Sequence, residues 1–209
     1  ILEKNRIQRL EPFQFGDPND LASYPRDETR DAAMAVDAGV DYLFVPGVEE
    51  MYPPGHATWI EVEGAATGLE GEFRPGHFRG VATVCLNLFT IVRPQLGYFG
   101  QKDAQQVAVI KQLVRDLHLE LDIRVIPTVR DVDGLALSSR NVRLSPAERR
   151  RALAIPRALQ AGAAAYREGR DAVEAARAAL EGIQTDYVAL ADFYGHPTLA
   201  VAAHIGSTR

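Results

Sequence analysis

Residues 97–127, which read GYFGQKDAQQVAVIKQLVRDLHLELDIRVIP, decide the fold of this chain. The apolar runs at 97–100 and 121–127 each predict a short strand, and the stretch 102–117 predicts a helix between them. The side chains of this helix that we expect to point inward are Val107, Ile110, Leu113, Val114 and Leu117. Two strands joined by a helix of this length predict an α/β unit with a parallel sheet, in which ligands bind at the carboxyl ends of the strands.

The residues before this unit continue the alternation of helix and strand. The stretch 27–38 predicts a helix that ends at Gly39. Its inward side chains are expected to be Ala33, Met34 and Ala38. The apolar run at 41–46 predicts a buried parallel strand, and the alternating residues 59–63 predict a half-exposed strand or arm.

A further helix is predicted at 78–92, because apolar side chains recur there at helical spacing. They are Val81, Val84, Cys85, Leu88 and Val92. Cys85 is the single cysteine of the chain, which excludes a disulfide framework and a zinc site built from cysteines. We expect it to be a small buried hydrophobic residue.

After about Val129, the alternation of strands and helices gives way to alanine-rich helices. Ser145-Pro-Ala-Glu148 is a capping box with proline at the first helical position, which predicts a helix start. The helix is expected to run to about Glu168 and to kink at Pro156. A second alanine-rich helix is predicted at about 171–180.

Two strands, at 186–191 and 199–203, complete a small α+β unit at the end of the chain. We therefore predict two domains. The first, at 1–128, is the α/β domain, and the second, at 129–209, is the α+β domain.

Composition limits the classes of function. The chain has 209 residues, 46% of them hydrophobic, with a net charge of −5 and a pI near 5.6. A protein built to bind polyanions is usually basic, so nucleic acid is not an expected partner. The apolar stretches are too short to span a membrane and no signal-peptide pattern opens the chain, so we expect a cytoplasmic location without membrane partners.

The sharpest chemical signal is Tyr98-Phe-Gly-Gln-Lys-Asp-Ala-Gln-Gln106, where a strand ends and a helix begins within two residues. Free backbone amides and the helix dipole make such a junction a place for an anion. Asp103 and Gln106 continue the inward face of the helix into its first turn, where that face meets the expected crevice. The alternative is structural, with Asp103 capping the helix, Gln106 at the surface and Lys102 solvated.

A second polar segment is Asp133-Gly-Leu-Ala-Leu-Ser-Ser-Arg-Asn-Val142. Its serine hydroxyls and its guanidinium suit phosphate oxygens, because both donate hydrogen bonds to them. A polar loop between two domains is the alternative interpretation.

A third segment, Leu69-Glu-Gly-Glu-Phe-Arg-Pro-Gly-His-Phe-Arg-Gly80, gathers Arg74, His77 and Arg79 just before a helix. Its glycines and Pro75 hold the backbone in special geometry. The cluster could bind an anion, and the alternative is a histidine with a structural role.

Together with Pro12-Phe-Gln-Phe-Gly16 and Tyr24-Pro-Arg26, these segments resemble the pantoate–β-alanine ligase (pantothenate synthetase) family. That family has the Lys-Asp motif with a downstream Gln, the Arg-Pro-Gly-His-Phe segment and a Ser-Ser-Arg-Asn loop, its version of the KMSKS-type loop. The resemblance runs from about Pro12 to Arg209. It implies a Rossmann-like parallel sheet of the class I synthetase and nucleotidyltransferase type, with a small α+β C-terminal lid domain.

The resemblance implies an enzyme, a carbon–nitrogen ligase of pantothenate and coenzyme A biosynthesis. ATP and pantoate give pantoyl adenylate and pyrophosphate, and β-alanine then attacks to give pantothenate and AMP. Mg²⁺ is implied with ATP, since two cations neutralise a triphosphate poorly, although no metal ligands are assigned. A homodimer through the larger domain is also implied.

Site residues follow from the resemblance by matching position. Lys102 and Arg140 would be the catalytic cations that stabilise charge on the phosphates. The residues that would bind ATP are Gly100, Gln101, Lys102, Asp103, Val129, Leu137, Ser138, Ser139 and Arg140. Those near pantoate or β-alanine would be Gln14, Tyr24, Glu70, Arg74, His77 and Gln106. The residues expected to face one crevice are Gln14, Lys102, Asp103, Gln106, Ser138 and Arg140.

The chain also departs from the family. The family's His-x-Gly-His segment, whose imidazoles sit on the triphosphate, has no match among the five histidines. Glu11, Gln101 and Leu137 stand where the family usually has Asn, Glu and Met. Glu11 should matter most, because it puts a negative charge beside an anionic substrate. We expect an incomplete first domain and little pantothenate from these 209 residues alone.

Two other functions stay open from the sequence. One is a truncated, non-catalytic remnant that keeps part of the fold. The other is a different adenylyl-forming nucleotidyltransferase, against which the pantoate-specific Gln14 and Gln106 argue. Substrate-dependent release of pyrophosphate separates these hypotheses.

Overall fold

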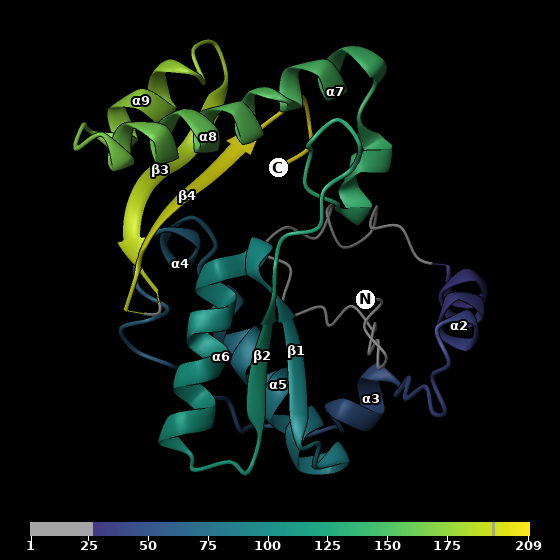
Figure 1. The fold of residues 1–209 in the computed structure, drawn as a ribbon. Coiled ribbons are helices and arrows are strands. Elements are labelled where there is room, and N and C mark those ends of the chain that lie inside the picture. The colour runs from purple at the N-terminus through teal and green to yellow at the C-terminus, as the bar shows by residue number, and fades with distance from the viewer. Residues whose placement is uncertain (1–26, 194) are drawn as a thin grey trace.

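The computed structural model describes residues 27–193 and 195–209 (Figure 1). In chain order, its elements are α2 (Glu28–Asp37), α3 (Val48–Met51), α4 (Glu70–Phe73), α5 (His77–Val92), β1 (Leu96–Gly100), the 3-10 helix η2 (Gln101–Asp103), α6 (Ala104–Asp116), β2 (Asp122–Ile126), the 3-10 helix η3 (Ser139–Arg143), α7 (Pro146–Ala152), α8 (Ala154–Arg167), α9 (Ala172–Ala178), β3 (Gln184–Asp192) and β4 (Pro197–His204).

The predicted strand–helix–strand unit is confirmed. β1 and β2 pair in parallel, with Leu96 opposite Asp122 and Gly100 opposite Ile126, and α6 connects them. A core cluster forms where α5 and α6 meet this sheet (Figure 1). It is built on Val81, Ile110 and Leu113, with Phe99 and Ile123 packed against it. The chain therefore has the α/β class that its sequence predicts.

The face of α6 that packs inward is close to the predicted one. Val107, Val109 and Ile110 have no exposed surface. Leu117 was predicted inward, and this is wrong, because 45% of its surface is exposed. It lies one residue past the end of α6, and the following His118 has φ 50°, so the chain has already turned away from the core.

The remaining predicted helices of the first half are present. Asp27 caps α2 by accepting a hydrogen bond from the Arg30 amide at 2.9 Å. The buried residue of α2 is Ala35, and the prediction that Ala33 points inward is wrong, because Ala33 lies two residues away and so on the opposite side of the helix. In α5, Cys85 packs among apolar side chains, and burial raises the pKa of its thiol to about 12.

Before α5, neither the strand predicted at 41–46 nor the strand alternative for 59–63 forms. Residues 41–46 are irregular, and Tyr42 is 89% exposed, so the prediction of a buried strand there is wrong. A strand needs a neighbour to pair with its backbone groups, and none of the described residues takes that place beside 41–46. Residues 59–63 form an arm, as one of the two predicted alternatives had it. Its Ile60 amide donates to Thr83 Oγ1 at 3.0 Å, and Ile60 and Val62 pack on the core.

The C-terminal half follows the predicted order of elements. Ser145 and Glu148 form the capping box at the start of α7. The helix breaks at Leu153, three residues before Pro156, because proline has no amide to bond the carbonyl four residues earlier. β3 and β4 then form an antiparallel hairpin that is separate from the β1–β2 sheet. Helices α8 and α9 cover one side of this hairpin (Figure 1).

The two halves meet near α4. Figure 1 places α4 beside the β3–β4 hairpin, near the end where β3 stops and β4 starts, and the rings of Phe73 and Tyr187 lie 6.1 Å apart. The carboxyl ends of β1 and β2 point toward the C-terminal half (Figure 1). None of the helices in the described part of the chain combines the length and the apolar character needed to cross a membrane.

Candidate functional site

The junction between β1 and α6 carries the first group of predicted site residues. β1 ends at Gly100, η2 contains Gln101, Lys102 and Asp103, and α6 follows directly. A Cβ built on Gly100 meets no atom within 4 Å, so the backbone is open there. The exposed Lys102 ammonium lies 3.5 Å from the Asp103 carboxylate. Asp103 makes no side-chain capping bond to α6, so the structural alternative for this residue is wrong.

Two neighbouring glutamines in the first turn of α6 lie in different environments. Gln106 is half-buried, whereas Gln105 is 5% exposed. The Gln105 side chain accepts from the Glu70 amide at 3.0 Å and donates to carbonyl oxygens of residues 65–68. Sequence reasoning passed over Gln105. Its spacing of three and four residues from the buried Ala108 and Val109 was the signal that places it on the inward face.

Glu70, predicted beside pantoate, is engaged with the C-terminal half. Its carboxylate accepts from the Tyr187 hydroxyl at 2.8 Å and from both terminal nitrogens of Arg209 at 2.8 and 2.9 Å. Burial raises the pKa of Glu70, but the Arg209 and Tyr187 hydrogen bonds and the charges of Arg209 and Arg74 outweigh it and hold that pKa below its usual value. The carboxylate is therefore ionised and bound to protein groups.

Arg74 and His77 lie close to Glu70. An Arg74 guanidinium nitrogen is 3.8 Å from the Glu70 carboxylate and 3.4 Å from His77 Nε2. His77 is buried at the start of α5, and its ring contacts Phe78 with centroids 5.0 Å apart. Arg79 lies apart from these residues, because it pairs with Glu61 at 3.4 Å and stacks over Trp59 at 5.0 Å.

The Ser-Ser-Arg-Asn segment forms a second group in the C-terminal half. The Leu137 amide donates to the Val129 carbonyl at 2.9 Å, which closes the loop between them, and both side chains are at least half exposed. Ser138 caps η3 by accepting from the Arg140 amide at 3.2 Å. Ser139 is exposed and Arg140 is half-buried.

This loop is fixed by α7. The Arg149 guanidinium donates to Asp131 at 2.7 Å and to Asp133 at 2.8 Å. The hydrogen bond and charge of Arg149 hold the pKa of Asp133 below its usual range. Both carboxylates are therefore partners of one arginine, and the residues before Ser138 are tied to the helix that follows them.

The structure thus forms two groups from the predicted site residues. Lys102, Asp103 and Gln106 share the β1–α6 junction, and Gln105 links them to the segment of Glu70, Arg74 and His77. Residues 129 and 137–140 form the other group. Gln14 and Tyr24 lie outside the described residues. That all of them face one crevice stays a prediction.

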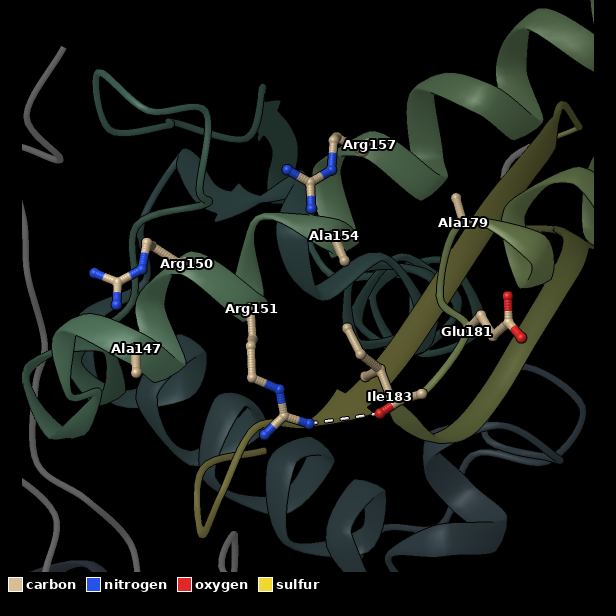
Figure 2. A pocket seen from close by; sticks show the side chains of 9 residues that line it. Ala147, Arg150, Arg151, Ala154, Arg157, Ala179, Glu181 and Ile183 are labelled. Atoms are coloured by element: carbon tan, nitrogen blue, oxygen red, sulfur yellow. Dashed lines mark hydrogen bonds between the residues drawn. The ribbon is translucent and has the colours of Figure 1, made fainter.

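Two surface hollows of the described ranges lie elsewhere. One has a volume of about 480 Å³, and Figure 2 shows that Arg150, Arg151 and Arg157 surround it on α7 and α8, opposite Glu181. A second hollow of about 380 Å³ lies between Arg130 and α8. Neither is lined by a predicted site residue. Within 27–193 and 195–209, no cluster of three or more His, Cys, Asp or Glu side chains is arranged to hold a metal ion.

Comparisons with known proteins agree on one family. The family model described as pantoate-beta-alanine ligase matches residues 10–209. A pantothenate synthetase of Moorella thermoacetica is 49% identical, with 96% of this chain and 76% of the relative covered. Another, from Chloroflexus aurantiacus, is 49% identical, covering 95% of this chain and 72% of the relative.

Solved structures give the same result. The pantothenate synthetase of Thermus thermophilus superposes with a TM-score of 0.87 at 45% identity, covering 93% of this chain and 76% of that chain. The pantoate-beta-alanine ligase of Francisella tularensis is described as complexed with beta-gamma ATP and beta-alanine. It superposes with a TM-score of 0.80 at 35% identity, covering 96% of this chain and 74% of that chain. This chain therefore belongs to the pantoate–β-alanine ligase family.

Proposed function

We propose that this chain catalyses the ATP-dependent ligation of pantoate to β-alanine through a pantoyl adenylate. The observation that carries the proposal is the match to the family over residues 10–209, which includes every described segment that we assign to the site. The F. tularensis relative, described as bound to beta-gamma ATP and beta-alanine, supports the same two ligands here.

The chemistry has two steps. A carboxylate oxygen of pantoate attacks the α-phosphorus of ATP, and the bond from that phosphorus to the bridging oxygen breaks and releases pyrophosphate. The amine of β-alanine then attacks the acyl carbon and loses a proton, and AMP leaves with the carboxylate oxygen. The products are pantothenate, AMP and pyrophosphate.

Lys102 and Arg140 are the cations that we assign to the phosphates. Lys102 is exposed at the open end of β1, and its 3.5 Å separation from Asp103 is longer than a hydrogen bond, so its ammonium can turn toward a ligand. A cation placed where negative charge develops lowers the barrier of such a transfer. The other proposed ATP contacts are Gly100, Gln101, Asp103, Val129, Leu137, Ser138 and Ser139.

Gln106 is the described residue that we assign to pantoate, with Arg74 and His77 beside it. Gln14 and Tyr24 complete this assignment, although both lie outside the described residues. We assign Glu70 a supporting role, because its carboxylate already binds Tyr187 and Arg209 and lies beside Arg74.

Mg²⁺ enters this proposal as part of the nucleotide substrate. Mg²⁺ is commonly held by substrate phosphates with one or two carboxylates. Asp103 is the carboxylate closest in sequence to the proposed phosphate contacts. The metal would neutralise charge on the triphosphate.

The organisation of the protein is also part of the proposal. We propose a Rossmann-like domain at 1–128, which binds nucleotide and pantoate, and a small α+β lid domain at 129–209. The separation of the β1–β2 and β3–β4 sheets supports this division. A homodimer and a cytoplasmic location stay predictions, and sedimentation equilibrium of the purified protein tests the first.

The experiment is an assay of pyrophosphate and pantothenate with the purified protein. We expect pyrophosphate release to require both ATP and pantoate, and only a little pantothenate to form when β-alanine is added, because no histidine pair of this chain matches the family's His-x-Gly-His segment. If pyrophosphate is released with a different carboxylic acid and not with pantoate, the protein is another adenylyl-forming enzyme. Absence of even a stoichiometric adenylate by mass spectrometry would favour the non-catalytic remnant.

A further inference from the structure

We propose that Gln105 is a positioning residue, which fixes the segment 65–70 on the first turn of α6 and so sets Arg74 and His77 relative to Gln106. The inference rests on the proposed function in one respect only, the assignment of Gln106, Arg74 and His77 to pantoate. The anchoring itself is a property of the described contacts.

The contacts of Gln105 use both ends of its amide. Oε1 accepts from the Glu70 amide at 3.0 Å. Nε2 lies 3.1, 3.3 and 3.1 Å from the carbonyl oxygens of Ala65, Thr67 and Gly68, which share its two hydrogens. A carboxylate of the same length could accept but not donate, and an apolar side chain could do neither. A buried primary amide is the group that satisfies this segment.

The segment needs such an anchor, because it has no regular structure of its own. Residues 64–69 form turns, with positive φ at Gly64, Gly68 and the non-glycine Leu69. A positive φ at a leucine persists only where surrounding contacts fix it. Packing is also tight, since a Cβ on Gly71 would come within 1.8 Å of the Ala66 carbonyl oxygen. Gln105 supplies hydrogen bonds on both sides of Leu69.

The same anchor joins two groups of candidate site residues. Gln105 is the neighbour of Gln106 and follows Lys102 and Asp103 in the chain. Glu70, whose backbone amide binds the Gln105 side chain, is the first residue of α4. Its carboxylate lies 3.8 Å from the Arg74 guanidinium, and the same guanidinium lies 3.4 Å from His77 Nε2. Release of the segment would move this chain of contacts away from Gln106. A misplacement of about 1 Å in an active site can cost about 10²-fold in rate.

The test compares Gln105→Met and Gln105→Glu with the unchanged protein. Gln112→Met and Gln112→Glu are matched controls on the same helix, because the hydrogen bonds of the Gln112 side chain join it to its helix neighbours Arg115 and Asp116. Three quantities are measured: amide hydrogen exchange of residues 64–74, affinity for pantoate, and affinity for a non-hydrolysable ATP analogue, both by calorimetry.

We expect Gln105→Met to speed exchange in 64–74 and to weaken pantoate binding by about 10–10²-fold, with a much smaller effect on the ATP analogue. Gln105→Glu should be as defective at pH 8 but partly restored near pH 5.5, since a protonated carboxyl regains one donor and burial raises the pKa of a glutamate. The Gln112 variants should match the unchanged protein.

Two results would overturn the proposal. One is Gln105→Met with unchanged exchange in 64–74. The other is an equal loss of affinity for pantoate and for the ATP analogue that follows the loss of folded protein, which would make Gln105 merely structural. If the unchanged protein does not bind pantoate, the proposed function fails, while the exchange data still decide whether Gln105 anchors the segment.

Discussion

At the scale of single residues, the first turn of α6 shows how one helix serves both the core and a ligand surface. Successive helical residues point about 100° apart, so Gln105 and Gln106 face different surroundings. Gln105 satisfies four backbone groups inside the protein, and Gln106 is half-buried at the edge of the junction. Lys102 and Asp103 lie one turn earlier and remain exposed to ligands.

Lys102→Met removes the proposed cation at the phosphates. We expect the rate of pyrophosphate release to fall by about 10²–10³-fold, because that is the usual effect of losing one group that stabilises transition-state charge. Lys111→Met is the matched control, since Lys111 lies further along α6 and outside the proposed site. Circular dichroism should show both variants folded. Equal activity of the two variants would contradict the role of Lys102.

At the scale of elements, α7 holds the loop that carries the proposed phosphate contacts. Arg149 bridges Asp131 and Asp133, and Ser138–Arg140 follow within a few residues. Arg149→Met breaks both ion pairs, so we expect affinity for the ATP analogue to fall by about tenfold as the loop loses its position. Arg150→Met, a change of the exposed neighbour on the same helix, should have no such effect. Calorimetry measures the affinity of both variants for the ATP analogue. Equal affinities would show that the position of the loop does not depend on the ion pairs of Arg149.

The turn before α4 gives a prediction for stability. Gly71→Ala places a Cβ 1.8 Å from the Ala66 carbonyl oxygen, so the backbone must move. We expect a loss of about 1–3 kcal/mol in the free energy of unfolding, the usual range for overpacking. Gly100→Ala is the stability control, because its Cβ meets no atom within 4 Å. Urea unfolding measures both, and equal stabilities would contradict the described packing.

The same elements explain what the sequence could predict. The β1–α6–β2 unit is contiguous, and its apolar spacing and end signals determine it locally. Residues 41–46 have the composition of a strand, but strand formation depends on a partner that local sequence does not specify. The Glu70 contacts to Tyr187 and Arg209 span 117 and 139 residues, so no local pattern could have indicated them.

At the scale of the whole molecule, one ionic network holds α4 to the C-terminal half. Arg209 binds Glu70 and Asp186, and His204 lies 2.9 Å from Asp186. Burial raises the pKa of Asp186, but Arg209 and His204 outweigh it, so that pKa lies below its usual value, as does that of Glu70. The unfolded chain therefore binds more protons than the folded one, and stability falls with decreasing pH.

This network predicts a pH dependence of stability. The contribution of Glu70 is present above its unfolded pKa of about 4.3 and is lost as pH falls through its lower folded pKa. Glu70→Gln should cost about 1.5–3 kcal/mol at pH 7, the range for hydrogen bonds to charged groups, and should flatten the decline below about pH 5. Glu72→Gln, on the exposed side of α4, should keep the decline. Urea unfolding at pH 7, 5 and 4 compares them, and equal slopes for all variants would contradict the network.

The most direct test of the proposed function follows the oxygen atoms of pantoate. The purified protein is given ATP, Mg²⁺, β-alanine and pantoate labelled with ¹⁸O in its carboxylate, and the products are analysed by mass spectrometry. A few turnovers suffice, so the result does not depend on the rate. A pantoyl adenylate predicts one ¹⁸O in AMP and one in pantothenate, with none in pyrophosphate. Label in inorganic phosphate with ADP as the nucleotide product, which indicates an acyl phosphate, would contradict it.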